Sequence, residues 1–130
     1  MPPMATTDFG PVFLRLRAIL AKHSPPLVVT SDTPASYSLD LDAPDVPAPR
    51  RYVGGVRIVK HYVSFYWMPV YGMPALLDDV SPELRSRMQG KSCFNFNRVD
   101  EPLARELDAL TVRSLAAYRK VVKTLFLKAR

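Results

Sequence analysis

The centre of the chain carries two dense runs of β-branched and aromatic residues, at positions 52–59 and 62–68. Such side chains favour strands, because they pack well on a pleated surface. The polar dipeptide at 60–61 is the predicted hairpin turn, with the glycine pair at 54–55 as the alternative turn or a bulge. Pro69 ends the second run, since proline cannot donate to a strand ladder. The fold must therefore be built around a central β-hairpin.

Apolar residues recur at helical spacing in two segments near the ends of the chain. The first covers residues 9–23 and stops at Pro25 and Pro26, because proline cannot continue a helix. The second is the last helix of the chain, whose buried face carries Leu115, Tyr118, Val122 and Leu125. These two segments predict an N-terminal and a C-terminal helix.

Shorter elements are predicted between the hairpin and the helices. Before the hairpin, we predict a weak strand at 27–30, an alternating strand at 36–42 and a proline-rich loop at 43–49. After it, we predict a short helix at 81–88, a strand at 92–97 and a helical stretch capped by Asp100. The order predicts one α+β domain over residues 1–130, with residues 1–8 flexible. Its antiparallel sheet has about five strands, with the N- and C-terminal helices packed on it.

The length of 130 residues suits a single domain. The only cysteine is Cys93, so no intramolecular disulfide can form. The longest apolar stretch, at 56–70, is interrupted by charged residues and a proline, and it cannot span a bilayer. The first eight residues lack a signal-peptide pattern. We therefore expect a cytoplasmic location and no membrane partner.

Three segments of the second half, at 62–69, 84–88 and 90–96, form a pattern of strand, helix, turn and Phe-rich strand. This pattern resembles the YdhG-like family of bacterial domains of unknown function. The resemblance covers roughly residues 50–120, and Lys-Ser-Cys-Phe-Asn-Phe at 91–96 is its most specific part. It implies a sandwich of helices on a sheet, distantly similar to frataxin. An iron-handling chaperone of frataxin-like type is therefore one alternative function.

Polar side chains alternate along the strand at 92–97 and on its approach. Lys91, Cys93 and Asn95 are predicted to share one face, with Tyr66 or Trp67 as walls of a small-ligand pocket. The competing interpretation is a solvated sheet face, which antiparallel sheets often show. No residue is a good candidate for a general base. The first hypothesis is thus a non-enzymatic binding protein, without a predicted cofactor, whose partner is a small molecule or a protein.

Cys93 has two interpretations. Lys91, two residues earlier, could lower the thiol pKa and make it reactive. A free cysteine more commonly behaves as a small buried hydrophobic residue. The central aromatic run is interpreted mainly as core, and any part of it left exposed would indicate a homodimer interface.

Asp40, Asp42 and Asp45 form a loose group of oxygen ligands. They lack the glycine and the distal glutamate of a calcium loop, so they are weak metal candidates.

The formal net charge is +6, and residues 111–130 hold six basic and no acidic side chains. This distribution suggests an anion or nucleic-acid binder acting through the C-terminal helix. A solvated helix face explains the same residues. The helix exposes no interleaved aromatics for base stacking, which argues against nucleic acid.

Overall fold

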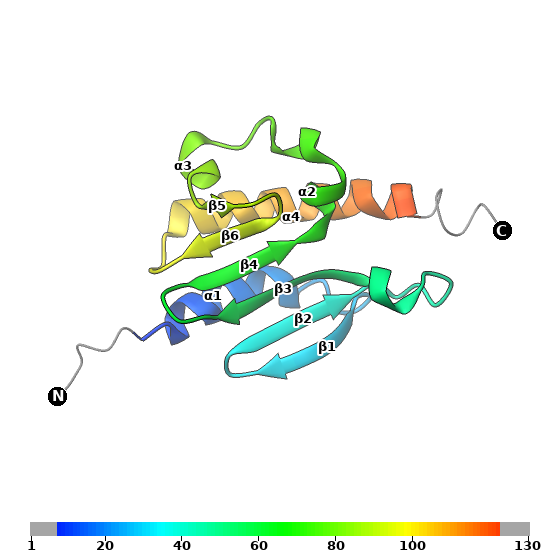
Figure 1. The fold of residues 1–130 in the computed structure, drawn as a ribbon, viewed down its shortest axis with the longest axis horizontal. Helices are drawn as coiled ribbons and strands as arrows, with labels where there is room; N and C mark the ends of the chain where they lie inside the picture. Colours follow the sequence, from blue (N-terminus) through cyan, green and yellow to red (C-terminus); the bar gives the residue numbers. More distant parts are fainter. Residues whose placement is uncertain (1–7, 123–130) are drawn as a thin grey trace.

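Two long helices pack on one face of an antiparallel sheet in the computed structural model, which describes residues 8–122 (Figure 1). The helices are α1 (Gly10–Ala21) and α4 (Glu101–Val122). The strands are β1 (Val28–Thr33), β2 (Ser36–Asp40), β3 (Tyr52–Ile58), β4 (Val63–Trp67), β5 (Met88–Gln89) and β6 (Cys93–Phe96). The predicted α+β class and both terminal helices are confirmed.

The six strands lie in the order β1-β2-β3-β4-β6-β5, and every neighbouring pair is antiparallel. The hairpin predicted around Lys60-His61 joins β3 to β4. The sheet has six strands instead of about five, because Met88 and Gln89 pair with β6. Met88 was expected in the short helix, which ends earlier. Gly90, with φ of 77°, makes the turn from β5 into β6.

Three short helical segments link β4 to β5 at the β5 edge of the sheet (Figure 1). They are α2 (Met68–Gly72), η2 (Pro74–Leu77) and α3 (Pro82–Arg85), while η1 (Ala48–Arg50) lies in the predicted proline-rich loop. Ser81 caps α3, since its Oγ accepts a hydrogen bond from the Leu84 amide at 3.1 Å. The two helical stretches expected after Asp100 form one continuous helix, α4.

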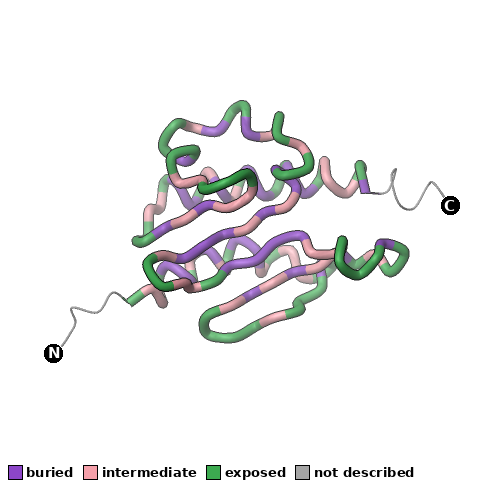
Figure 2. The backbone as a smooth tube through the Cα atoms, viewed as in Figure 1, coloured by how far each residue is buried: buried purple, intermediate pink, exposed green. Residues whose placement is uncertain are grey.

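The core lies between the sheet and the two long helices (Figure 2). Trp67 is fully buried there, and its indole Nε1 donates a hydrogen bond to Ser114 Oγ of α4 at 2.6 Å. Strands β3 and β4 are the most buried part of the sheet, whereas β1 is an exposed edge (Figure 2). The core therefore ties the central hairpin directly to the C-terminal helix.

Ion pairs hold α1 beside α4. Arg15 makes a bidentate pair with Glu101, with both N–O distances at 2.8 Å. About two turns further along both helices, Lys22 pairs with Asp108. The pairs occur in the same order along both helices, so the helices run in the same direction. The hydrogen bonds from Arg15 lower the pKa of the Glu101 carboxyl.

His23, just after α1, has an unusual environment. Its Nε2 is buried and has no hydrogen-bond partner among residues 8–122. Burial, and then the neighbouring charge of Lys22, lower the pKa of His23. An unfolded chain would take up a proton at this site near pH ~6.5, and the folded chain would do so only at lower pH.

We expect the free energy of unfolding to fall as the pH drops below about 6.5 toward this lowered pKa, because the unfolded state binds the extra proton. In His23→Gln this part of the pH dependence should disappear. Urea denaturation at several pH values between about 5 and 7.5 measures it. The exposed His61→Gln is the matched control and should keep the wild-type slope. An unchanged slope in His23→Gln would contradict the assignment.

Residues 1–7 and 123–130 lie outside the described part of the chain. The expectation of a flexible segment at 1–8 therefore falls almost wholly outside it, as does Leu125 of the predicted helix face. Within residues 8–122, no helix is long and apolar enough to cross a membrane.

Candidate functional site

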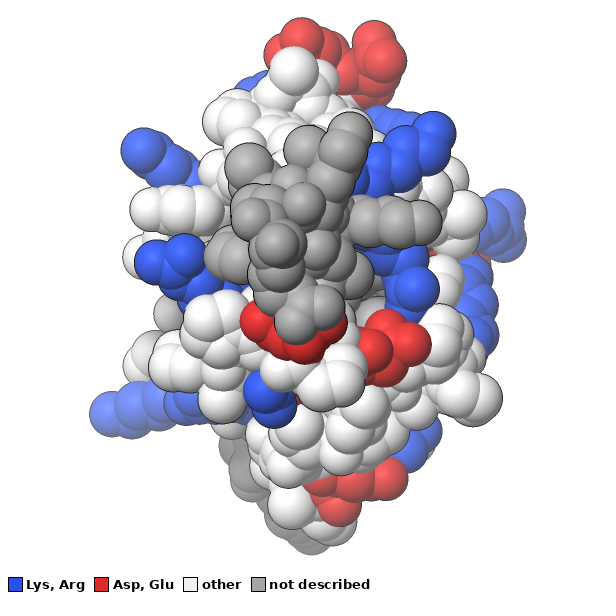
Figure 3. Space-filling view, turned by 90° about the vertical axis from the view of Figure 1, so that its right-hand side faces the viewer, with Lys and Arg blue, Asp and Glu red and all other residues white. Residues whose placement is uncertain are grey.

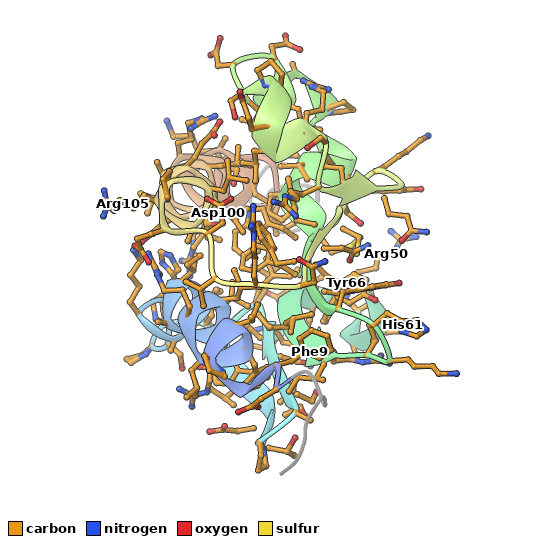
Figure 4. The ribbon with its side chains drawn as sticks, turned by 90° about the vertical axis from the view of Figure 1, so that its left-hand side faces the viewer. Phe9, Arg50, His61, Tyr66, Asp100 and Arg105 are labelled. Atoms are coloured by element: carbon orange, nitrogen blue, oxygen red, sulfur yellow. The ribbon has the colours of Figure 1, made fainter. Side chains whose placement is uncertain are left out.

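The sheet face turned away from α1 and α4, here called the open face, collects polar side chains from four strands. Register places Ser38 of β2 opposite Gly55 of β3, Gly55 opposite Tyr66 of β4, and Tyr66 opposite Cys93 of β6. Directly opposed residues in antiparallel strands share a face. Figure 4 shows Tyr66 pointing away from the long helices, on the same side of the sheet as His61 and Arg50.

A hollow of about 400 Å³ opens on this face above β3. Its lining residues are Ser38, Tyr52, Gly55, Val56, Arg57 and Tyr66. A Cβ atom on Gly55 would lie 3.0 Å from Tyr52 Oη and 3.2 Å from Ser38 Oγ. The missing side chain of Gly55 thus lets the Tyr52 hydroxyl lie across the strand. Tyr52 and Tyr66 therefore form the sides of the hollow, and the backbone at Gly55 forms its base.

Tyr52 stays protonated at neutral pH. Burial, and to a lesser extent its neighbour Tyr66, raise the pKa of Tyr52 to about 12. Its hydroxyl can therefore donate as well as accept a hydrogen bond.

Arg57 supplies the positive charge of the hollow. It is exposed, and no carboxylate of residues 8–122 forms an ion pair with it. Its guanidinium carries a positive charge and five hydrogen-bond donors. The hollow therefore combines a free cation with neutral hydroxyl groups.

Beside the hollow, Asn95 organises a small hydrogen-bond network. Its Oδ1 accepts from Ser64 Oγ at 2.7 Å and from Cys93 Sγ at 3.1 Å. Its Nδ2 donates to Gln89 Oε1 at 2.9 Å. This network fixes the orientation of the amide and fills the open face next to Tyr66.

Cys93 is half-buried. Burial raises the pKa of its thiol, against weaker lowering by hydrogen bonds with Ser64 and Tyr66. The expectation that Lys91 lowers this pKa is wrong, since Lys91 lies in the turn before β6 and burial dominates. The thiol thus favours its neutral, less nucleophilic form.

The structure brings three of the predicted site residues together and separates two. Tyr66, Cys93 and Asn95 share the open face. Trp67 does not belong to it, because neighbouring residues of a strand point to opposite faces and its ring is buried against α4. Lys91 is exposed in the β5–β6 turn and lines a different hollow.

Ser38, Tyr52, Gly55 and Arg57 are the site residues that sequence reasoning missed. The adjacent glycines at 54–55 were the available signal, because glycine within a strand often marks close approach of another group. Which side chains approach them depends on the register of three strands.

The three metal candidates do not form one group in the described part of the chain, although Asp42 and Asp45 line the same hollow. Asp42 pairs with Arg119 of α4 at 3.4 Å, and Asp40 ends β2 opposite Tyr52. Asp45 lies in the following loop. Within residues 8–122, no group of three or more His, Cys, Asp or Glu side chains is placed to hold a metal ion.

The basic C-terminal helix is only partly described. Arg113 and Lys120 are exposed, and Arg119 is engaged by Asp42, while Lys123, Lys128 and Arg130 lie outside the described residues. Figure 3 views this end of the molecule, where the visible Lys and Arg side chains are separated by uncharged and acidic ones. Anion or nucleic-acid binding through this helix stays a prediction.

The central aromatic run is mostly core, as predicted. Phe65 and Trp67 are buried and Tyr66 is half-buried, but Tyr71 remains 53% exposed. A homodimer through this run stays a prediction.

Comparisons with known proteins found no match among family models, curated proteins or solved structures. The resemblance to the YdhG-like family therefore stays a prediction, and the function must be argued from the residues themselves.

Proposed function

We propose that this chain is a binding protein for a small, flat, anionic molecule held in the hollow over Gly55. The observation that carries the proposal is the combination, around one hollow of about 400 Å³, of two tyrosines, a serine hydroxyl and Arg57, which pairs with no carboxylate of residues 8–122. This volume lies within the ordinary range of small-ligand sites, about 300–1,000 Å³.

The chemistry of the lining favours an anion over a cation. Arg57 binds carboxylate or phosphate oxygens through charge-assisted hydrogen bonds, which are about twice as strong as neutral ones. No acidic side chain lines the hollow to repel such a ligand. The hydroxyls of Ser38 and Tyr52 add neutral donors that do not compete for the charge.

The tyrosine walls favour a flat ligand. Aromatic side chains offer large apolar surfaces with a polar end, which suits rings that also carry a charged group. The adjacent Asn95 network is fully engaged with Ser64, Cys93 and Gln89, so it supports the site mainly by fixing the surface beside Tyr66. The site has no group placed for nucleophilic or metal-assisted chemistry, and binding is therefore the activity proposed.

Thermal denaturation with benzoate, adenosine monophosphate and inorganic phosphate tests this proposal. A flat anion should raise the melting temperature more than phosphate does, because only the flat anion also contacts the tyrosine rings. A ligand at a hundred times its Kd adds about 2.7 kcal/mol to stability, so the shift is measurable. In Arg57→Gln the affinity should fall at least about tenfold, because a hydrogen-bonded charge contributes roughly 1.5–3 kcal/mol.

Arg113→Gln is the matched control, since Arg113 is an exposed arginine on α4. It should bind as the wild type does. Equal affinities in the two variants, or no stabilisation of the wild type by either flat anion, would argue against the site. Ferrous iron in the same panel tests the iron-handling alternative.

A further inference from the structure

A second hollow, of about 430 Å³, lies at the β5 edge of the sheet and shares no lining residue with the hollow over Gly55. It is formed between α2, η2, α3 and the β5–β6 turn. Six of its lining residues determine its character: Val70, Tyr71, Leu77, Arg85, Met88 and Lys91. These residues come from five separate segments of the chain: α2, η2, α3, β5 and the β5–β6 turn.

The walls of this hollow are apolar. Val70 and Leu77 are buried, Met88 is half-buried, and Tyr71 leaves about half of its surface exposed at 53%. An exposed aromatic beside an apolar wall is a common feature of sites for apolar ligands. Methionine adapts its shape to irregular partners because its side chain is unbranched and polarisable.

The rim of the hollow is cationic. The Arg85 guanidinium donates a hydrogen bond to the Leu77 carbonyl, which fixes it at one wall. Lys91 is exposed in the turn next to Gly90. No acidic residue lines the hollow, and in residues 8–122 no carboxylate forms an ion pair with Arg85 or Lys91. An apolar cleft thus meets two positive charges that no carboxylate of residues 8–122 neutralises.

We propose that this hollow binds a small amphiphilic acid, with an apolar body against Val70, Leu77 and Met88 and an anionic head beside Lys91. The charge of the rim selects the anionic head, and the apolar walls select the body. Arg85 is partly committed to Leu77, so Lys91 is the main determinant of charge selectivity. This site is independent of the proposed function of the open face.

The probe is 8-anilinonaphthalene-1-sulfonate, which joins an apolar body to a sulfonate and fluoresces when shielded from water. Titration at low salt should give saturable fluorescence with the native protein and also with Arg57→Gln, in which the open-face hollow has lost its charge. Lys91→Gln should weaken binding about fivefold. The expected change is modest because solvent and salt weaken a charge contact at an exposed position. Tyr71→Asp, which places an acid at the rim, should weaken it further.

Two controls locate the effect. Lys60→Gln removes an exposed lysine from the β3–β4 turn and should leave the affinity unchanged. The neutral analogue N-phenyl-1-naphthylamine should bind wild type and Lys91→Gln equally well. Cooperative thermal unfolding of each variant shows that the fluorescence comes from the folded protein.

Three results would overturn the proposal. They are no saturable binding by the folded wild type, equal affinities in Lys91→Gln and Lys60→Gln, or loss of binding in Arg57→Gln. The last result would place the probe on the open face, and it would leave the proposed function of that face standing.

Discussion

Replacing Trp67 with alanine is expected to lower the free energy of unfolding by about 3–5 kcal/mol. The indole is fully buried, packs beside the ring of Phe65 and lies over Gly54. Its removal leaves a cavity between β4 and α4 and also deprives Ser114 of the Nε1 hydrogen bond. Since domains of this size are stable by only about 5–15 kcal/mol, the variant should be close to unfolding at 37 °C.

Urea denaturation followed by far-ultraviolet circular dichroism measures this loss, because Trp67 is the only tryptophan and fluorescence would vanish with it. Trp67→Phe keeps most of the volume and should cost clearly less. Tyr71→Ala removes an exposed aromatic and should change stability by no more than about 0.5 kcal/mol. A Trp67→Ala midpoint near that of Tyr71→Ala would show that the indole does not anchor the core.

The sequence predicted the architecture well wherever periodicity was strong. Residues 9–23 contain α1, and the two dense runs at the centre became β3 and β4 around the expected turn. The short strand β5 was missed, because two residues carry no detectable period of two. The five residues of α2 were missed because Pro69 and Gly72 were interpreted only as the end of the preceding strand. Proline is, however, well tolerated in the first turn of a helix.

The candidate site was predicted only in part. Tyr66, Cys93 and Asn95 do share one surface: alternation puts Cys93 and Asn95 on the same face of β6, and the antiparallel pairing of β4 with β6 sets Tyr66 opposite Cys93. Including Trp67 broke the alternation rule, since residues 66 and 67 must face opposite ways. Tyr52 and Arg57 could not be assigned, because their approach to Tyr66 depends on how three strands align.

Gly54 and Gly55 connect the core and the open face through a single stretch of β3. Neither needs a left-handed backbone, because neither has a positive φ. Both are required by close approach: Gly54 accommodates the ring of Trp67 on the helix side, and Gly55 accommodates the hydroxyl of Tyr52 on the open side. The same alternation that separates Tyr66 from Trp67 thus assigns one glycine to stability and the other to the hollow.

Gly54→Ala is expected to cost about 3 kcal/mol, near the upper end for overpacking of a core. A Cβ at this position would lie 2.6 Å from Trp67 Cε3 and 2.7 Å from the Tyr66 carbonyl oxygen. Neither neighbour can retreat easily, since one is held by Ser114 and the other is backbone of the paired strand. Gly55→Ala should cost less, because the contacts of its new Cβ are longer. The nearest backbone atom, the Tyr37 carbonyl oxygen, lies at 2.9 Å, and the other neighbours are side chains of the open face, which can shift.

The two variants are matched controls for each other, measured by urea denaturation and by the melting-temperature shift with a flat anion. Gly54→Ala should lose stability but, while folded, retain the shift, whereas Gly55→Ala should lose the shift because the methyl group enters the hollow. Combining Gly54→Ala with Trp67→Phe should recover at least about 0.5 kcal/mol relative to additivity, since contacting residues couple. Additive losses would show that the carbonyl of Tyr66, and not the indole ring, makes an alanine at position 54 costly.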